Sequence, residues 1–586
     1  MASIYDKSSL VLIPSGTKTG KVFSQKPVSG DGDFTFTRAS AATRVNADGN
    51  IEKETQNLLT QSNTFSSWSQ YAGITLTSGQ SGYDATNDAW KLEKDSSGPY
   101  LAITQSPNAS GVVTFSFYAK QGTLRYLNFY DPVGSAQIWF DLQAGTISGA
   151  VGSRIATNIE AAGNGFYRCS VTWNAGGTTE CRLYPTSSSG SYSTDAGYVY
   201  IQDAQLEQGL VARDYIETTT SAVYGGITDN VPRLDYTDSS CPALLLEPQR
   251  TNLINNSEYL NGVSTPINST ITPNQTTSPE NVVNASIFEV TAAAQPRIES
   301  TVNISSTYSL SIFVKKKVGD YFGFGFYSGG VDNNYARFNI STGSSDDITY
   351  LGNALSNGAI EDFGNGWYRI SAKLITDSNT GKSGAKFSAM SASSFSVGVV
   401  GDEFYLYGAQ IEAGSYATSY IPTYGSSVTL SQDEAIPPST SYDLSGSFSI
   451  FFSFGKTRKK AASGSTYFYW LNTNANDFML YTNAGGNQGL NVYLPNQGGY
   501  VFGSSSNAAW NSNESKICVT YDATTGRLAY FINGSKYNEQ TSVLSFTGDD
   551  VGSFIEGGAT NLAEIKKYMF FTQALSDEEV IDLTTI

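Results

Sequence analysis

The residues of this chain best suited to chemistry are aromatic side chains set among small polar ones. Tyr126, Tyr130 and Trp139 lie within one short stretch, and Tyr500 and Trp510 lie in a second stretch rich in Gly, Asn and Ser. Aromatic faces stack on the apolar C–H patches of sugar rings, while neighbouring amides and hydroxyls bond the sugar hydroxyls. These five residues are therefore candidate carbohydrate-binding residues. The alternative for each is an ordinary buried core or hairpin aromatic.

The sequence contains no histidine. That absence excludes Ser-His-Asp and Cys-His nucleophilic sites, His-ligated zinc and His proton switches. Two carboxylates about 5–9.5 Å apart could still cleave a glycosidic bond. The acidic clusters of the C-terminal part have ordinary explanations, since Asp549-Asp550 falls in a predicted turn and Asp577-Glu578-Glu579 at a predicted helix N-terminus. We therefore expect a protein that is not an enzyme, with a polysaccharide depolymerase as an alternative.

The charge balance argues against nucleic acid and membrane partners. The chain has 35 basic and 52 acidic residues, a net charge of −17. A nucleic-acid binder would show a basic footprint, and an acidic surface is repelled by anionic membranes. No apolar stretch approaches the length of a membrane span, and residues 1–7 lack the features of a secretory signal. We expect synthesis and folding in a cytoplasm.

The four cysteines, Cys169, Cys181, Cys241 and Cys518, are too scattered for a disulfide scaffold or a zinc site. Cys169 and Cys181 flank the turn 174–177 almost symmetrically, so they could face each other across a hairpin. Two reduced thiols are the alternative, which folding in a cytoplasm favours.

Four short segments recur in the same order at an offset of roughly 200 residues, which indicates a duplicated domain. The recurring pairs are 57–62 with 252–257, 114–120 with 309–315, 163–168 with 364–369, and 204–207 with 409–412. Aromatic-rich strand candidates and Gly-Asn-Gly turns at 163–165 and 364–366 predict antiparallel β structure in both copies. The chain is therefore all-β, with two jelly-roll sandwiches at 62–218 and 256–424.

The repeat also duplicates a charged pair. Arg168 and Glu207 of the first copy recur as Arg369 and Glu412 of the second. We predict that each pair forms a structural ion pair between neighbouring strands, and the alternative is a paired catalytic site.

A third module is expected at residues 425–586, and its first strand follows a predicted linker at 434–438. Strands are expected at 447–454, 516–521, 527–532 and 565–571, and Ser576 begins a capping box that should start a short helix. The segments 517–521, 530–534 and 571–580, with the turn at Gly526, resemble the laminin-G-like, concanavalin-A-like sandwich family. That resemblance implies a sandwich fold for this module.

The inter-module segments carry a second resemblance. Residues 10–14, 34–49, 231–236 and 241–253 resemble a block found in tailed-phage virion proteins, commonly met in phages of Bacteroidetes hosts as fibre or laminin-G-containing structural proteins. In those relatives the parts of the block lie close together, whereas here the first jelly roll is inserted between them. We therefore expect residues 1–61 and 219–255 to form one N-terminal attachment unit. The apolar run 10–13 is either a docking arm for another virion protein or the first strand of that unit.

The duplicated copies are also similar to carbohydrate-binding modules, in length and in their terminal Ala-Gln-Leu/Ile-Glu strand. Some such modules bind calcium through an Asp on the last strand. Asp203 occupies the matching position here, but the second copy has Gly408, so we assign no metal ligand and no cofactor.

Together these observations predict a virion fibre or adhesin that attaches to other virion proteins and binds host surface polysaccharide. The resemblance to phage fibres implies a homo-oligomer, most often a trimer. A decoration protein without a ligand is the alternative to the adhesin.

Overall fold

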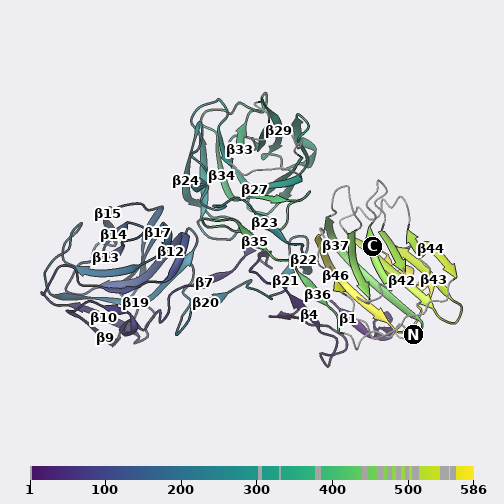
Figure 1. The fold of residues 1–586 in the computed structure, drawn as a ribbon, viewed down its shortest axis with the longest axis horizontal. Coiled ribbons are helices and arrows are strands. Elements are labelled where there is room, and N and C mark those ends of the chain that lie inside the picture. The colour runs from purple at the N-terminus through teal and green to yellow at the C-terminus, as the bar shows by residue number, and fades with distance from the viewer. Residues whose placement is uncertain are drawn as a thin grey trace.

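The computed structural model describes residues 3–300, 307–328, 331–375, 384–438, 446–458, 466–471, 478–482, 490–494, 500–503, 514–541, 553–554 and 562–585. Three β-sandwich lobes surround a central junction (Figure 1). We call them the first, second and terminal sandwiches. Among the described residues, no helix is long and apolar enough to span a membrane.

The first sandwich consists of two antiparallel sheets. One sheet contains, in spatial order, β16 (Ala156–Gly163), β17 (Phe166–Thr178), β12 (Asn108–Gln121), β19 (Gly197–Gln208), β10 (Ala89–Lys94) and β9 (Ile74–Gln80). The other contains β15 (Thr146–Val151), β14 (Ala136–Asp141), β13 (Tyr126–Asp131), β18 (Cys181–Thr186), β11 (Ile103–Gln105) and β8 (Ser69–Gln70). The short helix η1 (Phe65–Ser67) precedes them. The chain passes repeatedly between the sheets, as in a jelly roll.

The second sandwich repeats this strand order, which confirms the jelly-roll duplication. Its first sheet contains β24 (Ser269–Thr276), β25 (Ala285–Val290), β34 (Glu403–Ala413), β27 (Thr307–Val318), β32 (Trp367–Ile375) and β31 (Leu355–Asp362). Its second sheet contains β26 (Arg297–Ser300), β33 (Gly384–Met390), β28 (Tyr321–Ser328), β29 (Val331–Asn339) and β30 (Thr349–Leu351). The helices η2 (Leu260–Gly262) and η3 (Ser345–Asp347) complete it.

Alternating apolar residues from both sheets build each jelly-roll core. In the first sandwich, Phe115, Phe117, Phe129 and Trp173 pack between the sheets. Trp367 of the second copy is also buried. Both Gly-Asn-Gly turns have positive φ at all three residues and close the hairpins β16–β17 and β31–β32. Gly adopts that backbone conformation without strain, and Asn tolerates it better than most other residues.

The recurring sequence segments form a clasp that closes each sandwich at its entry and exit. Asn57 donates to the carbonyl oxygens of Ala204 (3.1 Å) and Ile216 (2.8 Å). In the second copy, Asn252 donates to Ala409 (3.2 Å) and Ile421 (2.8 Å) in the same way. A buried amide that reaches both the last strand and the exit segment satisfies backbone groups that the sheets leave unpaired. The repeated motif is therefore explained by closure of the fold.

The terminal sandwich draws strands from three distant parts of the chain. Its first sheet contains β21 (Arg233–Asp235), β22 (Ala243–Leu246), β46 (Leu562–Phe571), β37 (Phe448–Arg458), β42 (Ser515–Asp522), β43 (Arg527–Ile532) and β44 (Ser535–Thr541), with β1 (Leu10–Leu12) also paired to β46. Its second sheet contains β2 (Thr17–Lys18), β3 (Lys21–Val22), β4 (Phe34–Thr37), β36 (Glu434–Ile436), β45 (Ser553–Phe554), β38 (Thr466–Leu471), β39 (Phe478–Thr482), β40 (Leu490–Leu494) and β41 (Tyr500–Gly503).

This arrangement differs from the predicted domain boundaries in two ways. Residues 10–37 and 233–246 are strands of the terminal sandwich rather than a separate N-terminal unit, because Leu10, Phe34 and Leu244 are buried in its core. Residues 434–436 are strand β36 rather than a linker. The run 10–13 is a strand, paired to β46 at its buried residues, and not a free docking arm.

The predicted C-terminal helix is α2 (Asp577–Thr584), and its Ser576 capping box is present. Val580 of α2 packs with Phe531 and Met569 on the outer side of the first sheet. The short N-terminal helix α1 (Ile4–Lys7) packs beside them, and Lys7 pairs with Glu579. The two ends of the chain therefore cover one face of the terminal sandwich together (Figure 1).

A buried ionic cluster, which we call the hub, holds the junction of the lobes. Asp433 accepts hydrogen bonds from Arg38 (3.2 Å) and from Arg233, and Arg233 also pairs with Glu247 (2.6 Å). All four side chains are essentially inaccessible to solvent. Burial alone would lower the pKa of Arg233, but Asp433 and Glu247 outweigh it and raise that pKa. Two cations and two anions thus neutralise each other in a site that is buried from solvent.

Short strand pairs continue the junction between lobes. These are β7 (Thr55–Asn57) with β20 (Val223–Gly225), β23 (Arg250–Asn252) with β35 (Val428–Leu430), and β5 (Arg44–Val45) with β6 (Ile51–Glu52). Lys53 lies 2.5 Å from Glu258 and 2.6 Å from Glu280, and Glu280 also pairs with Arg213. Arg213 follows the last strand of the first sandwich, whereas both glutamates belong to the second. This cluster therefore joins the two jelly rolls.

We expect Asp433→Ala to destabilise the protein by about 3–5 kcal/mol, because it leaves two buried guanidinium groups without their shared carboxylate. The control is Arg44→Ala, which removes a partly exposed pair with Glu52 and should change stability by about 1 kcal/mol or less. Denaturant unfolding of both variants measures this. Equal, small effects would show that the hub does not hold the junction.

A fragment of residues 425–586 should fail to fold, because β1, β4 and β22 would be missing from its core. A fragment of residues 56–219, which keeps the whole first sandwich and its clasp, is the control and should melt cooperatively. Thermal unfolding followed by near-ultraviolet circular dichroism measures both. A cooperative transition in the 425–586 fragment would contradict this assignment of strands.

Candidate functional site

The outward side of the sheet that contains β13, β14 and β18 gathers aromatic and amide side chains. Inward residues such as Leu127 and Phe129 fill the core, so the alternate residues point outward. The strand register places them in three rows across the sheet: Asp141–Tyr126–Thr186, Trp139–Asn128–Tyr184 and Gln137–Tyr130–Arg182. We call this surface the aromatic face.

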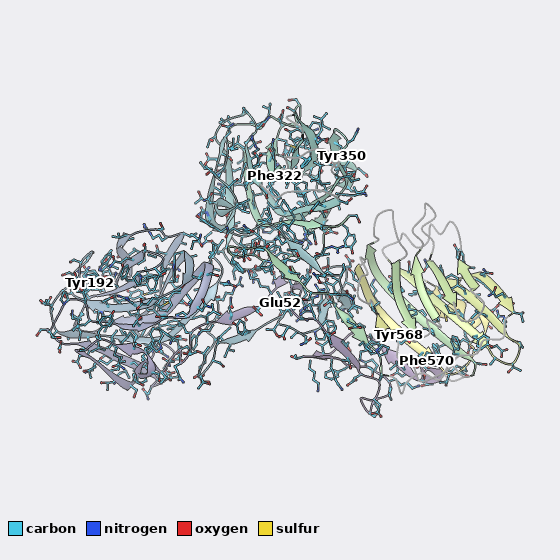
Figure 2. The ribbon with its side chains drawn as sticks, in the orientation of Figure 1. Glu52, Tyr192, Phe322, Tyr350, Tyr568 and Phe570 are labelled. Atoms are coloured by element: carbon cyan, nitrogen blue, oxygen red, sulfur yellow. The ribbon has the colours of Figure 1, made fainter. Side chains whose placement is uncertain are left out.

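A loop between β18 and β19 lies over part of the aromatic face. Its Tyr192 ring lies 5.0 Å from the Tyr184 ring and 6.2 Å from the Trp139 ring, measured between centroids. Gln137 donates to the Tyr192 hydroxyl, and the Trp139 indole donates to the Ser191 carbonyl at 3.3 Å. Tyr192 lies on the side of the first sandwich away from the junction (Figure 2). The face is therefore presented outward.

Tyr100 extends the aromatic face beyond the loop. Its ring meets the Tyr192 ring edge-on at 5.0 Å, and 61% of its surface is exposed. Tyr126 and Tyr130 are half-buried. Burial raises the pKa of Tyr184 and also that of Tyr192, so both stay neutral near neutral pH. The accessible platform consists of the rings of Tyr100, Tyr192 and Tyr130.

The structure brings together three of the five predicted aromatic residues. Tyr126, Tyr130 and Trp139 all lie on the aromatic face, but Trp139 is only 2% exposed because the Tyr192 loop covers it. Trp510 and the side chain of Tyr500 lie outside the described residues, as does the Asp549-Asp550 pair. Sequence reasoning missed Tyr100, Tyr184 and Tyr192. The lone tyrosine in the serine-rich run 187–193 was the available signal for Tyr192.

The second sandwich keeps part of this arrangement but not the tyrosine platform. Tyr321 pairs with Asn339 as Tyr126 pairs with Asp141, which sets the correspondence between the copies. Arg337 therefore takes the place of Trp139, and Phe395 of the corresponding loop lies over it, with the guanidinium 4.5 Å from the ring centre. Asn128 and Tyr130 correspond to Gly323 and Gly325, and Gln137 corresponds to the buried Tyr335. A loop aromatic over the sheet is thus common to both copies, whereas Tyr130 and the amides belong to the first copy.

Two arginines border the aromatic face, and each is bound to a carboxylate. Arg182 donates to both oxygens of Glu180, at 2.8 Å each. Arg125 donates to both oxygens of Asp141, at 2.9 and 2.6 Å. These hydrogen bonds hold the pKa of each carboxyl below its ordinary value. The positive charge of each guanidinium group is therefore balanced by a neighbouring carboxylate of the same chain.

The predicted ion pairs Arg168–Glu207 and Arg369–Glu412 are wrong. In each copy the central strand, β12 or β27, separates the two residues, so their strands are not neighbours. Arg168 donates to the Arg213 carbonyl, and Arg369 donates to the Ser311 hydroxyl at 3.1 Å.

The two glutamates hold the turn that follows the last strand instead. Glu207 accepts from the side chain of Gln205 (2.7 Å) and the backbone of Arg213 (2.9 Å). Glu412 accepts from the side chain of Gln410 (2.8 Å) and the backbone of Thr418 (2.8 Å) in the same manner. Their recurrence is therefore structural.

Asp203 and Gly408 do occupy equivalent positions. Both have positive φ, of 49° and 62°, at a bulge in the last strand. Asp203 accepts from the Tyr83 hydroxyl at 3.1 Å. Among the described residues, no group of three or more Asp, Glu or Cys side chains is arranged to hold a metal ion.

Cys169 and Cys181 do not face each other across a hairpin. Cys169 lies on β17 and Cys181 on β18, which belong to opposite sheets of the first sandwich. Both are buried free thiols in its core. The turn at 174–177 is instead part of β17, which runs on to Thr178.

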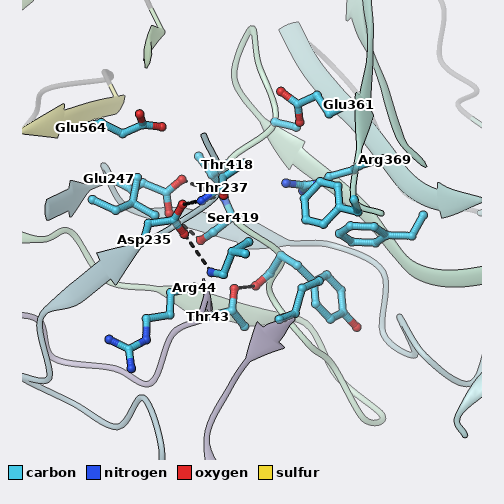
Figure 3. Close-up of a pocket in the computed structure, with 17 residues that line it drawn as sticks. Thr43, Arg44, Asp235, Thr237, Glu247, Glu361, Arg369, Thr418, Ser419 and Glu564 are labelled. Atoms are coloured by element: carbon cyan, nitrogen blue, oxygen red, sulfur yellow. Dashed lines mark hydrogen bonds between the residues drawn. The ribbon is translucent and has the colours of Figure 1, made fainter. Parts of the chain in front are cut away.

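A cleft at the junction is a second candidate site. Figure 3 shows Asp235, Glu247 and Ser419 on one side of it and Arg369 on the other. Asp235 accepts from the Val45 backbone at 2.9 Å, and Glu247 accepts from the Ser419 backbone at 2.7 Å. These groups hold the junction segments together. The cleft therefore borders the hub, with which it shares Glu247.

No family model and no curated protein matches the chain. Among solved structures, the CBM40 of Ruminococcus gnavus IT-sialidase bound to α2,3-sialyllactose is 21% identical, covering 24% of this chain and 83% of that one, with a TM-score of 0.20. The binding domain of botulinum neurotoxin DC in complex with SialylT is 18% identical, covering 26% and 39%, with a TM-score of 0.22. A pentraxin from Limulus polyphemus is 12% identical, covering 24% and 70%, with a TM-score of 0.20. These values identify no family for the chain.

Asp203 should make the first sandwich less stable as pH rises. Burial, with Asp88 and Asp84 nearby, raises the pKa of Asp203 from 3.8 to about 7. The folded state therefore holds a proton between about pH 4 and 7 that the unfolded state has lost, and stability falls across that range.

We expect Asp203→Asn to remove this fall. The free energy of unfolding of the variant minus that of the parent protein should increase by on the order of 2 kcal/mol from pH 4 to pH 8. Hydrogen exchange of β19 amides measures this difference at each pH. Asn tolerates the positive φ of this position. The exposed Asp195→Asn is the control. An unchanged difference between variant and parent at the two pH values would contradict the raised pKa.

Proposed function

We propose that the first sandwich binds a host-surface glycan through its aromatic face. The observation that carries the proposal is the grouping of the Tyr100, Tyr130 and Tyr192 rings with the Gln137 side chain on one outward surface. In the strand register the second copy has Gly325 in place of Tyr130 and the buried Tyr335 in place of Gln137. Flat rings suit the C–H faces of pyranoses, and amides bond their hydroxyls. Both carboxylates beside the face are held by arginine, which supports binding without cleavage.

We also propose that the chain is a virion protein of a tailed phage and acts as an adhesin. The support is the sequence resemblance of residues 34–49, 231–236 and 241–253 to phage virion proteins. Arg38, Arg233 and Glu247, three charged members of that block, are hub residues. Attachment to other virion proteins and assembly as a homo-oligomer, most often a trimer in such fibres, belong to the same proposal. Weak binding at each site would be strengthened by many copies on one particle.

Binding to a printed panel of bacterial polysaccharides, with the protein coupled to beads for multivalency, tests the glycan proposal. We expect Tyr100→Ala and Tyr130→Ala each to weaken binding by roughly tenfold or more, because each removes a stacking surface. The matched control is Tyr350→Ala, an exposed tyrosine on the second sandwich (Figure 2), which should leave binding unchanged.

Three results would count against the glycan proposal. Binding that survives both first-sandwich substitutions would place the ligand elsewhere on the chain. No binding at all, even with the protein on beads, would favour a decoration protein without a ligand. Release of reducing ends from a bound polysaccharide would instead favour the depolymerase. The virion proposal is tested separately with labelled antibodies against this protein, applied to purified particles of a phage that carries its gene.

A further inference from the structure

The charges around the aromatic face bear on the class of glycan that it would take. Recognition of an acidic sugar needs a cationic side chain that is free to donate hydrogen bonds to the carboxylate, sulfate or phosphate of the ligand. Three cationic side chains of the first sandwich lie at or beside the face: Arg125, Arg182 and Lys94. What each one already binds decides whether it is available.

Arg182 is the cation closest to the platform, and its charge is already matched by a carboxylate. Its guanidinium lies 6.0 Å from the centre of the Tyr130 ring. Nε and Nη2 donate to Glu180, and Nη1 donates to the Tyr184 hydroxyl at 3.2 Å. Glu180 is held in turn by the Thr104 hydroxyl at 3.0 Å. A ligand anion would therefore approach a guanidinium that is already paired in bidentate geometry, and it would be repelled by Glu180.

The other two cations are also engaged. Arg125 donates twice to Asp141, which also accepts from the backbone of Gln143 and Ala144. Lys94 is buried and donates to the Ser193 carbonyl under the loop. Asp195 in the same loop is exposed and adds negative charge. The surroundings of the face therefore favour an uncharged ligand over an anion.

Building on the proposed function, we infer that the aromatic face selects neutral glycans and excludes acidic ones. Glu180 is the residue that sets this selectivity, because it occupies the guanidinium of Arg182. Stacking and amide hydrogen bonds would carry the affinity, and neither depends strongly on ionic strength.

The test compares neutral and acidic polysaccharides on the same panel, using the full chain on beads at low and high salt. We expect binding to neutral polysaccharides only, little changed by salt and lost in Tyr100→Ala. In Glu180→Gln, Arg182 loses its anionic partner, and binding to acidic polysaccharides should appear or strengthen by roughly tenfold at low salt and fall at high salt.

Two controls separate this mechanism from others. Glu160→Gln removes an exposed carboxylate on β16 of the opposite sheet and should not create acidic binding. Arg154→Ala removes an exposed arginine in the turn after β15 and should leave neutral binding unchanged. Thermal unfolding of each variant confirms that the fold is kept.

The outcomes distinguish this inference from the proposed function. Acidic binding by the unmodified chain that Tyr100→Ala abolishes would overturn the selectivity while leaving the glycan site in place. Glu180→Gln that folds normally but gains no acidic binding would overturn the role of Glu180. Absence of binding to every polysaccharide would overturn both proposals.

Discussion

The arrangement of the three lobes depends on the neutralisation of buried charge at the hub. Arg38, Arg233, Glu247 and Asp433 come from segments far apart in the chain. Each of these charged side chains is buried from solvent, so each needs the others to balance its charge. Desolvating any one of them alone would cost several kcal/mol. The segments that carry them therefore have to meet at one point. Because these segments lead into all three sandwiches, the hub also fixes where each sandwich begins.

The terminal sandwich illustrates the same constraint. Strand β46 pairs with β37 along one edge and with β1 and β22 along the other. Its core is complete only when residues from both ends of the chain are present. The two jelly rolls behave differently, since each closes on itself through an asparagine clasp. The two jelly rolls are therefore self-contained insertions, whereas the terminal sandwich needs strands from distant parts of the chain.

Duplication separated structural from functional requirements in the jelly rolls. Both copies keep the clasp, the glutamate that holds the exit turn, and a loop aromatic over the sheet. In the second copy, Arg337 occupies the position of Trp139. It lies between the Tyr321 and Phe395 rings and donates to the loop carbonyls of Ser391 and Ala392, so the cation holds the loop. In the first copy the same sheet presents Tyr130 and Gln137 outward. The difference between the copies, rather than their similarity, is what points to a ligand.

The sequence by itself determined the all-β class, the duplication, the Gly-Asn-Gly turns and the capped C-terminal helix, because each depends on local backbone preferences or on a repeat visible in the chain. It also named Tyr126, Tyr130 and Trp139 as candidates within one short stretch, and the structure places all three on the aromatic face. Only the tertiary structure decided the rest. The Tyr192 loop buries Trp139, and an intervening strand separates Arg168 from Glu207. The N-terminal strands join the terminal sandwich, and distant charges meet in the hub. These features come from contacts between residues far apart in sequence, which local patterns do not encode.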